Sequence, residues 1–259
     1  MTVKIHAKFR KSGFMGIRKG PVPVRFHVLG ERSSGTNFVK RILGRNTDLT
    51  PTEALGWKHG FPNATAIPAD MVVVVAIRDA RAWARSMHAK PWHSEAPLQR
   101  LEFSDFIRAE WRTIADRDRY FPKDAELGIR GQPLQHDRHP MTGLPFENLF
   151  ALRRAKLWSH LSYLNRGCSV VLCRMEDTIA NPDVFLQQFR AAMAMPAVDT
   201  PPQKVVKRLG ANFRAAVNTR PDTPREFPPE DMDFLRANVV VKLEQALGYD
   251  YETGAEKPE

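Results

Sequence analysis

A short polar loop near the start of the chain holds the residues best suited by type and spacing to chemistry. Ser34-Gly35-Thr36 follows a β-type run, and Gly30 and Gly35 allow backbone to come close to a ligand. A helix is expected directly after the loop, with its free N–H groups and positive dipole end aimed at the same point. The pattern therefore predicts an anion site, most simply for a phosphate.

The loop differs from a nucleoside-triphosphate loop at two positions. Gly30 and Gly35 have the spacing of G-x-x-x-x-G-K-[ST], but Thr36 and Asn37 stand where lysine and a serine or threonine are expected. The phosphate-bridging lysine and the metal-binding hydroxyl are therefore both absent. This disfavours an ATP or GTP hydrolase and indicates an anion loop that needs no magnesium ion.

A second group of residues follows the apolar run at 71–77. Arg78-Asp79 comes directly after this run, and Ser86 lies eight residues beyond Arg78. An arginine at a strand's carboxyl end and a hydroxyl on the second turn of the next helix can face one phosphate. The simpler alternative is that Arg78 pairs with a carboxylate, Asp79 caps the helix and Ser86 is exposed.

The elements that would position these residues alternate between strand and helix. We expect strands at 24–29, 54–57, 71–77 and 169–173, and helices at 37–43, 80–90, 103–117, 146–165 and 182–193. The run at 71–77 is apolar without alternation, as in a central strand covered on both faces. The fold class predicted is α/β, with a doubly wound, mostly parallel sheet flanked by helices.

We expect one domain over residues 1–259, with three distinctive segments. They are a basic N-terminal segment at 1–20, a long excursion at 118–145 that could cover an acceptor, and a proline-rich stretch with a final helix at 200–259. That helix is expected at 231–247, closed by Gly248. The basic segment is read as solvated or edge-strand chain, or else as a polyanion site. Arg153, Arg154 and Lys156 are expected on a solvated helix face.

Taken together, the motifs resemble those of the sulfotransferase family that uses 3′-phosphoadenosine 5′-phosphosulfate. The family has a [KR]-Ser-Gly-Thr-[TSN] loop, then a strand ending in Arg-[ND]-Pro with a serine eight residues after the arginine. Here 34–37 match the first motif, while Arg78-Asp79 and Ser86 match the second. A third match is 174–182, Arg-Met-Glu-Asp-Thr-Ile-Ala-Asn-Pro, which resembles the family's strand-to-helix turn. The three matches extend from about residue 24 to residue 189.

The resemblance implies a P-loop-like sulfotransferase architecture and assigns roles to residues. The 5′-phosphosulfate would be held by Arg32, Ser33, Ser34, Gly35, Thr36 and Asn37, and the 3′-phosphate by Arg78 and Ser86. Segment 56–62 lies where many members carry a catalytic Lys-x-His-x-Pro sequence. Lys58 would neutralise charge on the transferring group and His59, one place early, would take the acceptor's proton. Arg32 also departs by one place, since Ser33 occupies the family's usual cation position. Arg32 would either act as a catalytic cation on the sulfonate or form a structural ion pair with Glu31.

The expected function is transfer of a sulfuryl group from this donor to a hydroxyl or amine, with adenosine 3′,5′-bisphosphate as product and no metal. The acceptor would be a carbohydrate, a glycolipid or a small metabolite. An ATP-dependent kinase of the P-loop class is one alternative. The net charge of +10 and pI near 9.9 suggest the other, a non-catalytic polyanion-binding protein. We do not expect a nucleic-acid partner, and the oligomeric state stays open.

Composition adds an expectation about location. No apolar run approaches the roughly 20 residues of a membrane span, and residues 1–20 lack the apolar core of a signal peptide. A cytoplasmic protein is expected, with a charge that is compatible with contact at a membrane surface. Cys168 and Cys173 are too few for a disulfide framework and are read as reduced core thiols.

Overall fold

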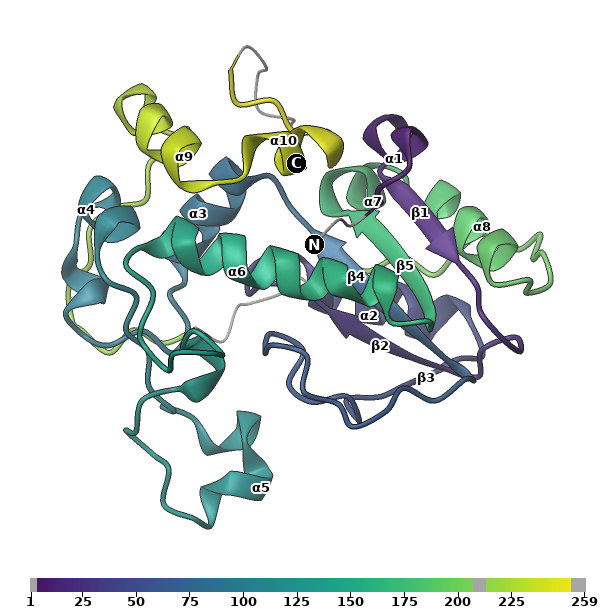
Figure 1. Ribbon diagram of the computed structural model, residues 1–259, viewed down its shortest axis with the longest axis horizontal. Coiled ribbons are helices and arrows are strands. Elements are labelled where there is room, and N and C mark those ends of the chain that lie inside the picture. Colours follow the sequence, from purple (N-terminus) through teal and green to yellow (C-terminus); the bar gives the residue numbers. More distant parts are fainter. Residues whose placement is uncertain (1–3, 207–212, 253–259) are drawn as a thin grey trace. The chain divides into compact units, whose positions relative to one another are not determined.

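A mostly parallel five-stranded sheet, flanked by helices, confirms the α/β prediction (Figure 1). The structure, a computed structural model, describes residues 4–206 and 213–252. They group into two units. The sheet unit comprises the described residues of Met1–Asp79, Lys156–Leu209 and Val240–Glu259, and the second unit those of Ala80–Ala155 and Gly210–Val239. The single domain over residues 1–259 stays a prediction.

The sheet has the strand order β1-β5-β4-β2-β3. Its strands are β1 (Phe14–Ile17), β2 (Arg25–Leu29), β3 (Thr50–Pro51), β4 (Met71–Ile77) and β5 (Ser169–Arg174). β2, β3, β4 and β5 run parallel, while β1 pairs antiparallel with β5. Because parallel strands end at one edge, the chain leaving β2, β4 and β5 emerges on the same side of the sheet.

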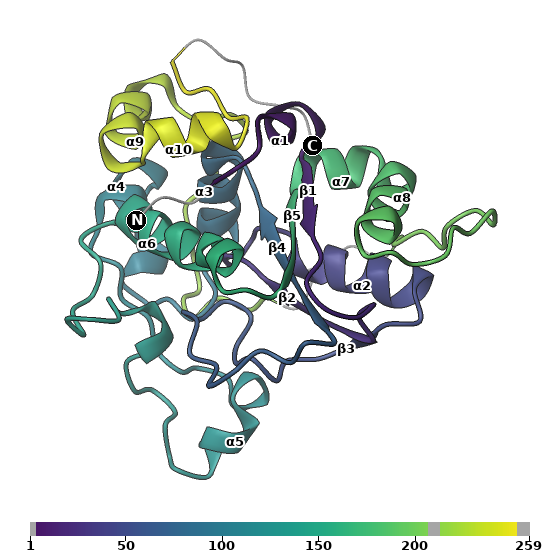
Figure 2. The ribbon, with the colours of Figure 1, turned by 45° about the vertical axis from the view of Figure 1, so that its right-hand side comes forward.

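The hydrophobic core of the sheet unit explains why β4 lacks an alternating pattern. Val72, Val74 and Ala76 pack on one face against residues of α2 (Thr36–Asn46) and α8 (Pro182–Ala192). Figure 2 shows these two helices together on one side of the sheet. Val73 and Val75 point the opposite way and are buried as well. A strand covered on both faces must be apolar at every position.

The basic N-terminal segment forms a short helix and then an edge strand. α1 (Ala7–Ser12) precedes β1, whose Phe14 is paired with Cys173 of β5. This agrees with the edge-strand reading of the segment. The parts of the predictions for 1–20 and 200–259 that fall on residues 1–3, 207–212 and 253–259 lie outside the described residues.

The strand predicted at 54–57 is wrong. The pairing partner of β2 at this point is the earlier Thr50–Pro51, whereas 54–57 form a turn. The Gly56 N–H donates to the Glu53 carbonyl, and Gly56 has a φ of +100°, which glycine tolerates best. The apolar Leu55 and Trp57 therefore belong to a turn rather than to a ladder.

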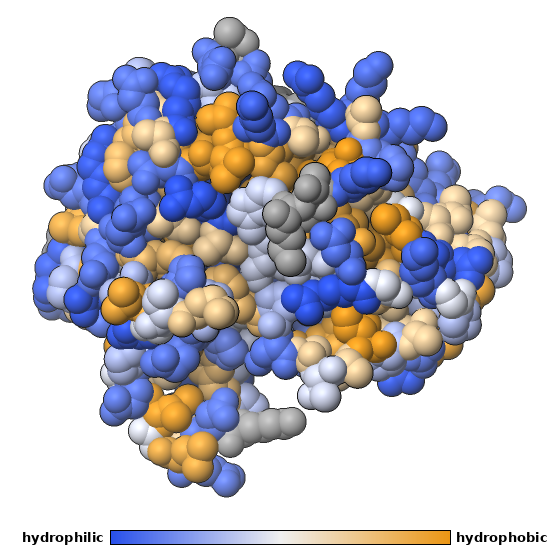
Figure 3. Space-filling view, in the orientation of Figure 1, coloured by the Kyte–Doolittle hydropathy of each residue, from blue (hydrophilic) through white to orange (hydrophobic). Residues whose placement is uncertain are grey.

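The second unit combines short helices with irregular chain. Its helices are α3 (Ala80–Ala89), α4 (Phe103–Arg108), α5 (Pro122–Ala125) and α9 (Met232–Asn238), together with the first part of α6 (Leu149–Leu161). Its core is largely aromatic, with Trp83, Phe106, Trp111 and Phe150 fully buried. Figure 3 shows apolar surface where α5 lies, and the excursion at 118–145 exposes Leu127, Met141 and Leu144.

The helix predicted over 103–117 is too long, because α4 ends at Arg108. Trp111, Thr113 and Ala115 are buried, while Arg112 is exposed and Ile114 is half-buried. This alternation has a period of two, and Trp111 and Ile114 form isolated bridges with Phe146 and Pro133. The helical spacing of 103, 107, 111 and 114 is therefore fortuitous, because only the first two lie in α4 and the last two lie on opposite faces of the strand-like segment.

The helix predicted over 231–247 is divided in two. α9 ends at Asn238, Val239 is extended with ψ 166°, and α10 (Val241–Ala246) begins afterwards. Two successive β-branched valines lower helix propensity at the break. The break falls at the boundary between the two units.

No helix in residues 4–206 and 213–252 has the length and apolar character that a bilayer crossing requires.

Candidate active site

The loop after β2 is compact because two glycines leave room for its neighbours. A Cβ on Gly30 would lie 2.5 Å from Ser34 Oγ and 2.6 Å from the Ala76 carbonyl oxygen. Gly35, the N-cap of α2, has a φ of +84°, and a Cβ there would overlap the Met175 side chain. The loop is thus pressed against β4 and the start of α7 (Met175–Ala180). Only glycine fits at either point without displacement.

Three hydroxyl residues of the loop and the helix start have different environments. Ser34 is buried, and its hydroxyl donates to the Glu31 carbonyl at 2.7 Å, so this side chain closes the loop on itself. Ser33 has a φ of +64°, a left-handed conformation that is uncommon for serine. Thr36 is 3% exposed at the first position of the helix. The N–H groups at the start of α2 lie at its positive end, and those of Phe38 and Val39 donate to the Gly35 carbonyl.

Lys58 reaches this helix start from a segment far along the chain. Its Nζ donates to Asn37 Oδ1 at 2.6 Å, and the Gly30 N–H donates to the Lys58 carbonyl at 3.1 Å. Burial lowers the pKa of Lys58, and the nearby Glu53 carboxylate opposes that shift. The segment therefore runs beside the loop, with the ammonium group against the first turn of α2.

His59 is held in one tautomer by the loop. Its Nδ1 lies 2.7 Å from the Gly30 carbonyl oxygen, which can only accept, so Nδ1 carries the hydrogen and Nε2 carries the lone pair. Burial, followed by the charges of Lys58, Arg32 and Lys156, holds the pKa of His59 well below its usual range. At neutral pH the imidazole is uncharged and can accept a proton at Nε2.

Lys156 is a site residue that the sequence predictions missed. We expected it on a solvated face of α6, but it is 3% exposed. Its Nζ donates to the His59 carbonyl at 2.6 Å and lies 4.2 Å from the centre of the Phe61 ring. One turn later, His160 Nε2 lies 3.1 Å from the Gly60 carbonyl oxygen, to which it donates. The four-residue spacing of Lys156 and His160 on one helix face was the available signal.

The expectation for the neighbouring arginines is also partly wrong. Arg153 is fully buried in the second unit, where its guanidinium lies 5.3 Å from the Trp83 ring. Arg154 does have a partly exposed side chain and lies 3.9 Å from Glu147. Stacking on an aromatic face allows a guanidinium to be buried where a solvated position was predicted.

Arg32 lies in the loop and contributes to a concentration of positive charge. It is 6% exposed, and its guanidinium carbon is 5.9 Å from the Trp57 ring. Arg32, Lys58 and Lys156 all act on the pKa of His59. Three cations around a neutral base and a helix N-terminus produce a local potential that favours an anion.

Arg78 extends from the end of β4 to the same loop. Its Nη1 donates to the Ser33 carbonyl at 2.9 Å. The next residue is fixed too, because the Asp79 N–H donates to Glu176 Oε1 at 2.8 Å. Tyr249 donates to the other Glu176 oxygen at 3.1 Å, and burial raises the pKa of that carboxyl. The ends of β4 and β5 are thereby joined just beside Arg78.

The structure places the predicted residues in two groups. Arg32, Ser33, Ser34, Gly35, Thr36, Asn37, Lys58, His59 and Arg78 come together in the sheet unit. Ser86 belongs to α3 in the second unit, so its pairing with Arg78 stays a prediction.

Comparison with known proteins found no match of this chain to a family model, a curated protein or a solved structure. Its function is therefore argued from the geometry of these residues.

Proposed function

We propose that the chain is a sulfotransferase that uses 3′-phosphoadenosine 5′-phosphosulfate to modify a hydroxyl or amine. The observation that carries the proposal is the placement of Lys58 and His59 on one short segment beside the anion loop. Lys58 contacts Asn37 in the first turn of α2, while His59 is bonded to Gly30 where the loop begins. A cation and a neutral base at the same loop supply the two functions that sulfuryl transfer needs.

In the proposed reaction, the acceptor oxygen attacks the sulfur of the donor. The bond between sulfur and the bridging oxygen of the 5′-phosphate breaks, and its electron pair stays on adenosine 3′,5′-bisphosphate. The acceptor proton passes to His59 Nε2. N–H groups at the start of α2, with Lys58 and Arg32, stabilise charge that develops on the leaving phosphate.

The donor is proposed from two groups of residues, one in the anion loop and one after β4. The 5′-phosphosulfate would occupy the region from Ser33 to Asn37. The 3′-phosphate would contact Arg78, whose guanidinium is already at Ser33, together with Ser86. ATP has no 3′-phosphate for these residues to bind. In addition, Thr36 occupies the position where a P-loop kinase has its phosphate-binding lysine. The acceptor class stays as predicted, a carbohydrate, glycolipid or small metabolite.

A ligand-dependent stability measurement tests the donor class. The melting temperature of the purified chain is measured with adenosine 3′,5′-bisphosphate, ADP or ATP, each with and without magnesium. Strong stabilisation by the bisphosphate alone, independent of magnesium, supports the proposal. Preference for ATP with magnesium would indicate the kinase alternative. Equal, steeply salt-dependent effects of all three would indicate a general polyanion binder.

A further inference from the structure

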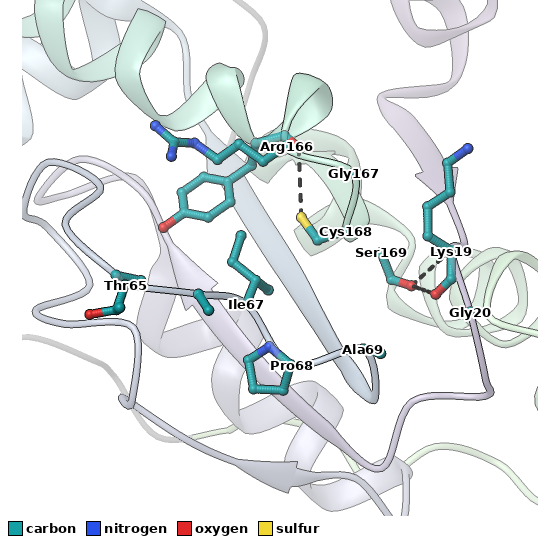
Figure 4. A pocket seen from close by; sticks show the side chains of 13 residues that line it. Lys19, Gly20, Thr65, Ile67, Pro68, Ala69, Arg166, Gly167, Cys168 and Ser169 are labelled. Atoms are coloured by element: carbon teal, nitrogen blue, oxygen red, sulfur yellow. Dashed lines mark hydrogen bonds between the residues drawn. The ribbon is translucent and has the colours of Figure 1, made fainter.

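The sheet unit contains a second concave region, at the opposite edge of the sheet from the anion loop. It is a pocket of about 440 Å³ between segment 64–69, which leads into β4, and residues 163–169, which lead into β5 (Figure 4). The anion loop follows the carboxyl end of β2, whereas this pocket precedes the amino ends of β4 and β5. The two are therefore separate sites. A volume of this order suits a small organic ligand.

The walls of the pocket are tied together before any ligand binds. The Ser169 hydroxyl donates to the Lys19 carbonyl and accepts from the Lys19 N–H, both at 2.9 Å. Cys168 Sγ donates weakly to the Tyr163 carbonyl at 3.7 Å. Figure 4 shows both links at the edge of the pocket. These contacts join the chain after β1 to the start of β5, so the ligand does not have to organise the walls.

The charges around the pocket have one sign. Lys19 and Arg166 are its charged lining residues, and no acidic residue lines it. In the part of the chain that the structure describes, neither cation forms an ion pair. Arg166 Nε donates to Ser162 Oγ at 3.1 Å, and the guanidinium lies 5.3 Å from the Tyr163 ring. In Figure 4 the two side chains lie on different sides of the pocket, and each is a long flexible chain whose charged end can turn toward an anion bound at its own part of the rim.

The opposite wall is apolar. Ile67 and Pro68 lie there together with three alanines of the same segment, at positions 64, 66 and 69. Tyr163 is 1% exposed, and burial raises the pKa of its hydroxyl, so that the group stays protonated at neutral pH. The pocket thus combines an apolar surface with a rim that carries two positive charges.

We propose that this pocket binds an amphiphilic monoanion, a molecule with an apolar body and one carboxylate or sulfate-type head group. The body packs against Ile67 and Pro68, and the head group lies at the rim, where Arg166 or Lys19 pairs with it. Such a ligand matches both halves of the lining, whereas a neutral apolar molecule leaves the cations without a partner. The site is independent of the donor site proposed above.

Cys168 provides a direct readout of the pocket. Cys173 is buried in β5 with a pKa raised to about 12, so a maleimide reagent modifies the half-buried Cys168 first. The rate of modification is measured by mass spectrometry with naphthalene-2-sulfonate, naphthalene-2-carboxylate or the neutral naphthalene-2-methanol. Protection by one or both acids, and much less by the alcohol, supports the proposal and shows which head group is preferred. Equal protection by the alcohol, or no protection by either acid, overturns it.

Matched variants test the two cations. Affinity for the protecting acid is measured by calorimetry in the Cys168→Ser background, which removes thiol chemistry. Arg166→Ala or Lys19→Ala is expected to weaken binding by about tenfold, as for loss of a charge-assisted contact. Lys11→Ala, which removes an exposed lysine of α1 outside the pocket, should leave affinity unchanged. Equal affinity in all three variants would contradict the assignment of the head group. Donor-site ligands are not involved, so failure here is separate from failure of the proposed function.

Discussion

Lys58 and Asn37 are 21 positions apart, yet Lys58 Nζ donates to Asn37 Oδ1 at 2.6 Å. The contact brings a cation from the chain between β3 and β4 to the first turn of α2. Asn37 stands where a triphosphate loop has its metal-binding hydroxyl, and here its side chain accepts from a lysine instead. The charge at the helix start is thus supplied by a distant lysine rather than by a lysine of the loop itself.

Replacing Lys58 by alanine is expected to lower turnover more than donor affinity. The ammonium group would act mainly on charge that develops as the donor bond breaks, so kcat should fall by about 10² to 10³. Steady-state kinetics and titration with adenosine 3′,5′-bisphosphate separate the two effects. Lys11→Ala, which removes an exposed lysine of α1, is the control. A kcat equal to that of the parent would remove Lys58 from the catalytic residues.

Replacing Arg78 by alanine is expected to weaken binding of adenosine 3′,5′-bisphosphate by about 2 to 3 kcal/mol. Affinity for adenosine 5′-phosphate should change much less, because that ligand lacks the second phosphate. Calorimetry with both ligands provides the comparison. Arg25→Ala, which breaks the exposed ion pair with Asp70 at the start of β2, is the control. Equal losses for the two ligands would mean that Arg78 acts only through its bond to Ser33.

The pH dependence of turnover reports on His59. Its pKa lies well below the usual value of 6.5, so the base stays neutral as pH falls through 6.5. The pH at which kcat declines on the acid side is therefore expected to lie below 6.5. Lys156→Gln removes one of the charges that depress this pKa. The pKa then rises and the acid limb moves to higher pH. Lys8→Gln, on exposed α1, should leave the limb in place.

The parts of this arrangement that could be predicted from sequence are those set by local pattern. β4 matches its predicted bounds because a short, uniformly apolar run is typical of a strand buried on both faces. The start of α2 follows from the glycine-flanked loop before it. The burial of Lys156 was not predictable in this way. A lysine among arginines on an apparently polar helix face is expected to be solvated, whereas tertiary contacts, among them those with His59 and Phe61, compensate for its burial. Likewise, the helical spacing within 103–117 was fortuitous, because only its first part forms α4 and the buried residues after Arg108 alternate.

His160 is expected to make folding stability depend on pH below about 6.5. Burial, and then Lys156, lowers its pKa to about 3. Between these values the unfolded chain binds one more proton at this site, so stability falls as pH falls, by about 1.4 kcal/mol per pH unit. His160→Gln keeps a donor for the Gly60 carbonyl but cannot titrate. Urea unfolding at about pH 7, 6 and 5 should therefore show a shallower decline for the variant. Parallel curves would contradict the assignment.

Gly35 and Met175 provide a test of the loop's packing. Gly35→Ala places a methyl group into the Met175 side chain and also forces alanine to a φ of +84°. We expect the free energy of unfolding to fall by about 2 to 4 kcal/mol, from overlap and backbone strain together. In a Met175→Ala background the overlap disappears and only the strain remains, so the same substitution should be less damaging. A double-mutant cycle from urea unfolding measures the difference. If the two backgrounds respond alike, the loop does not pack on Met175 as described.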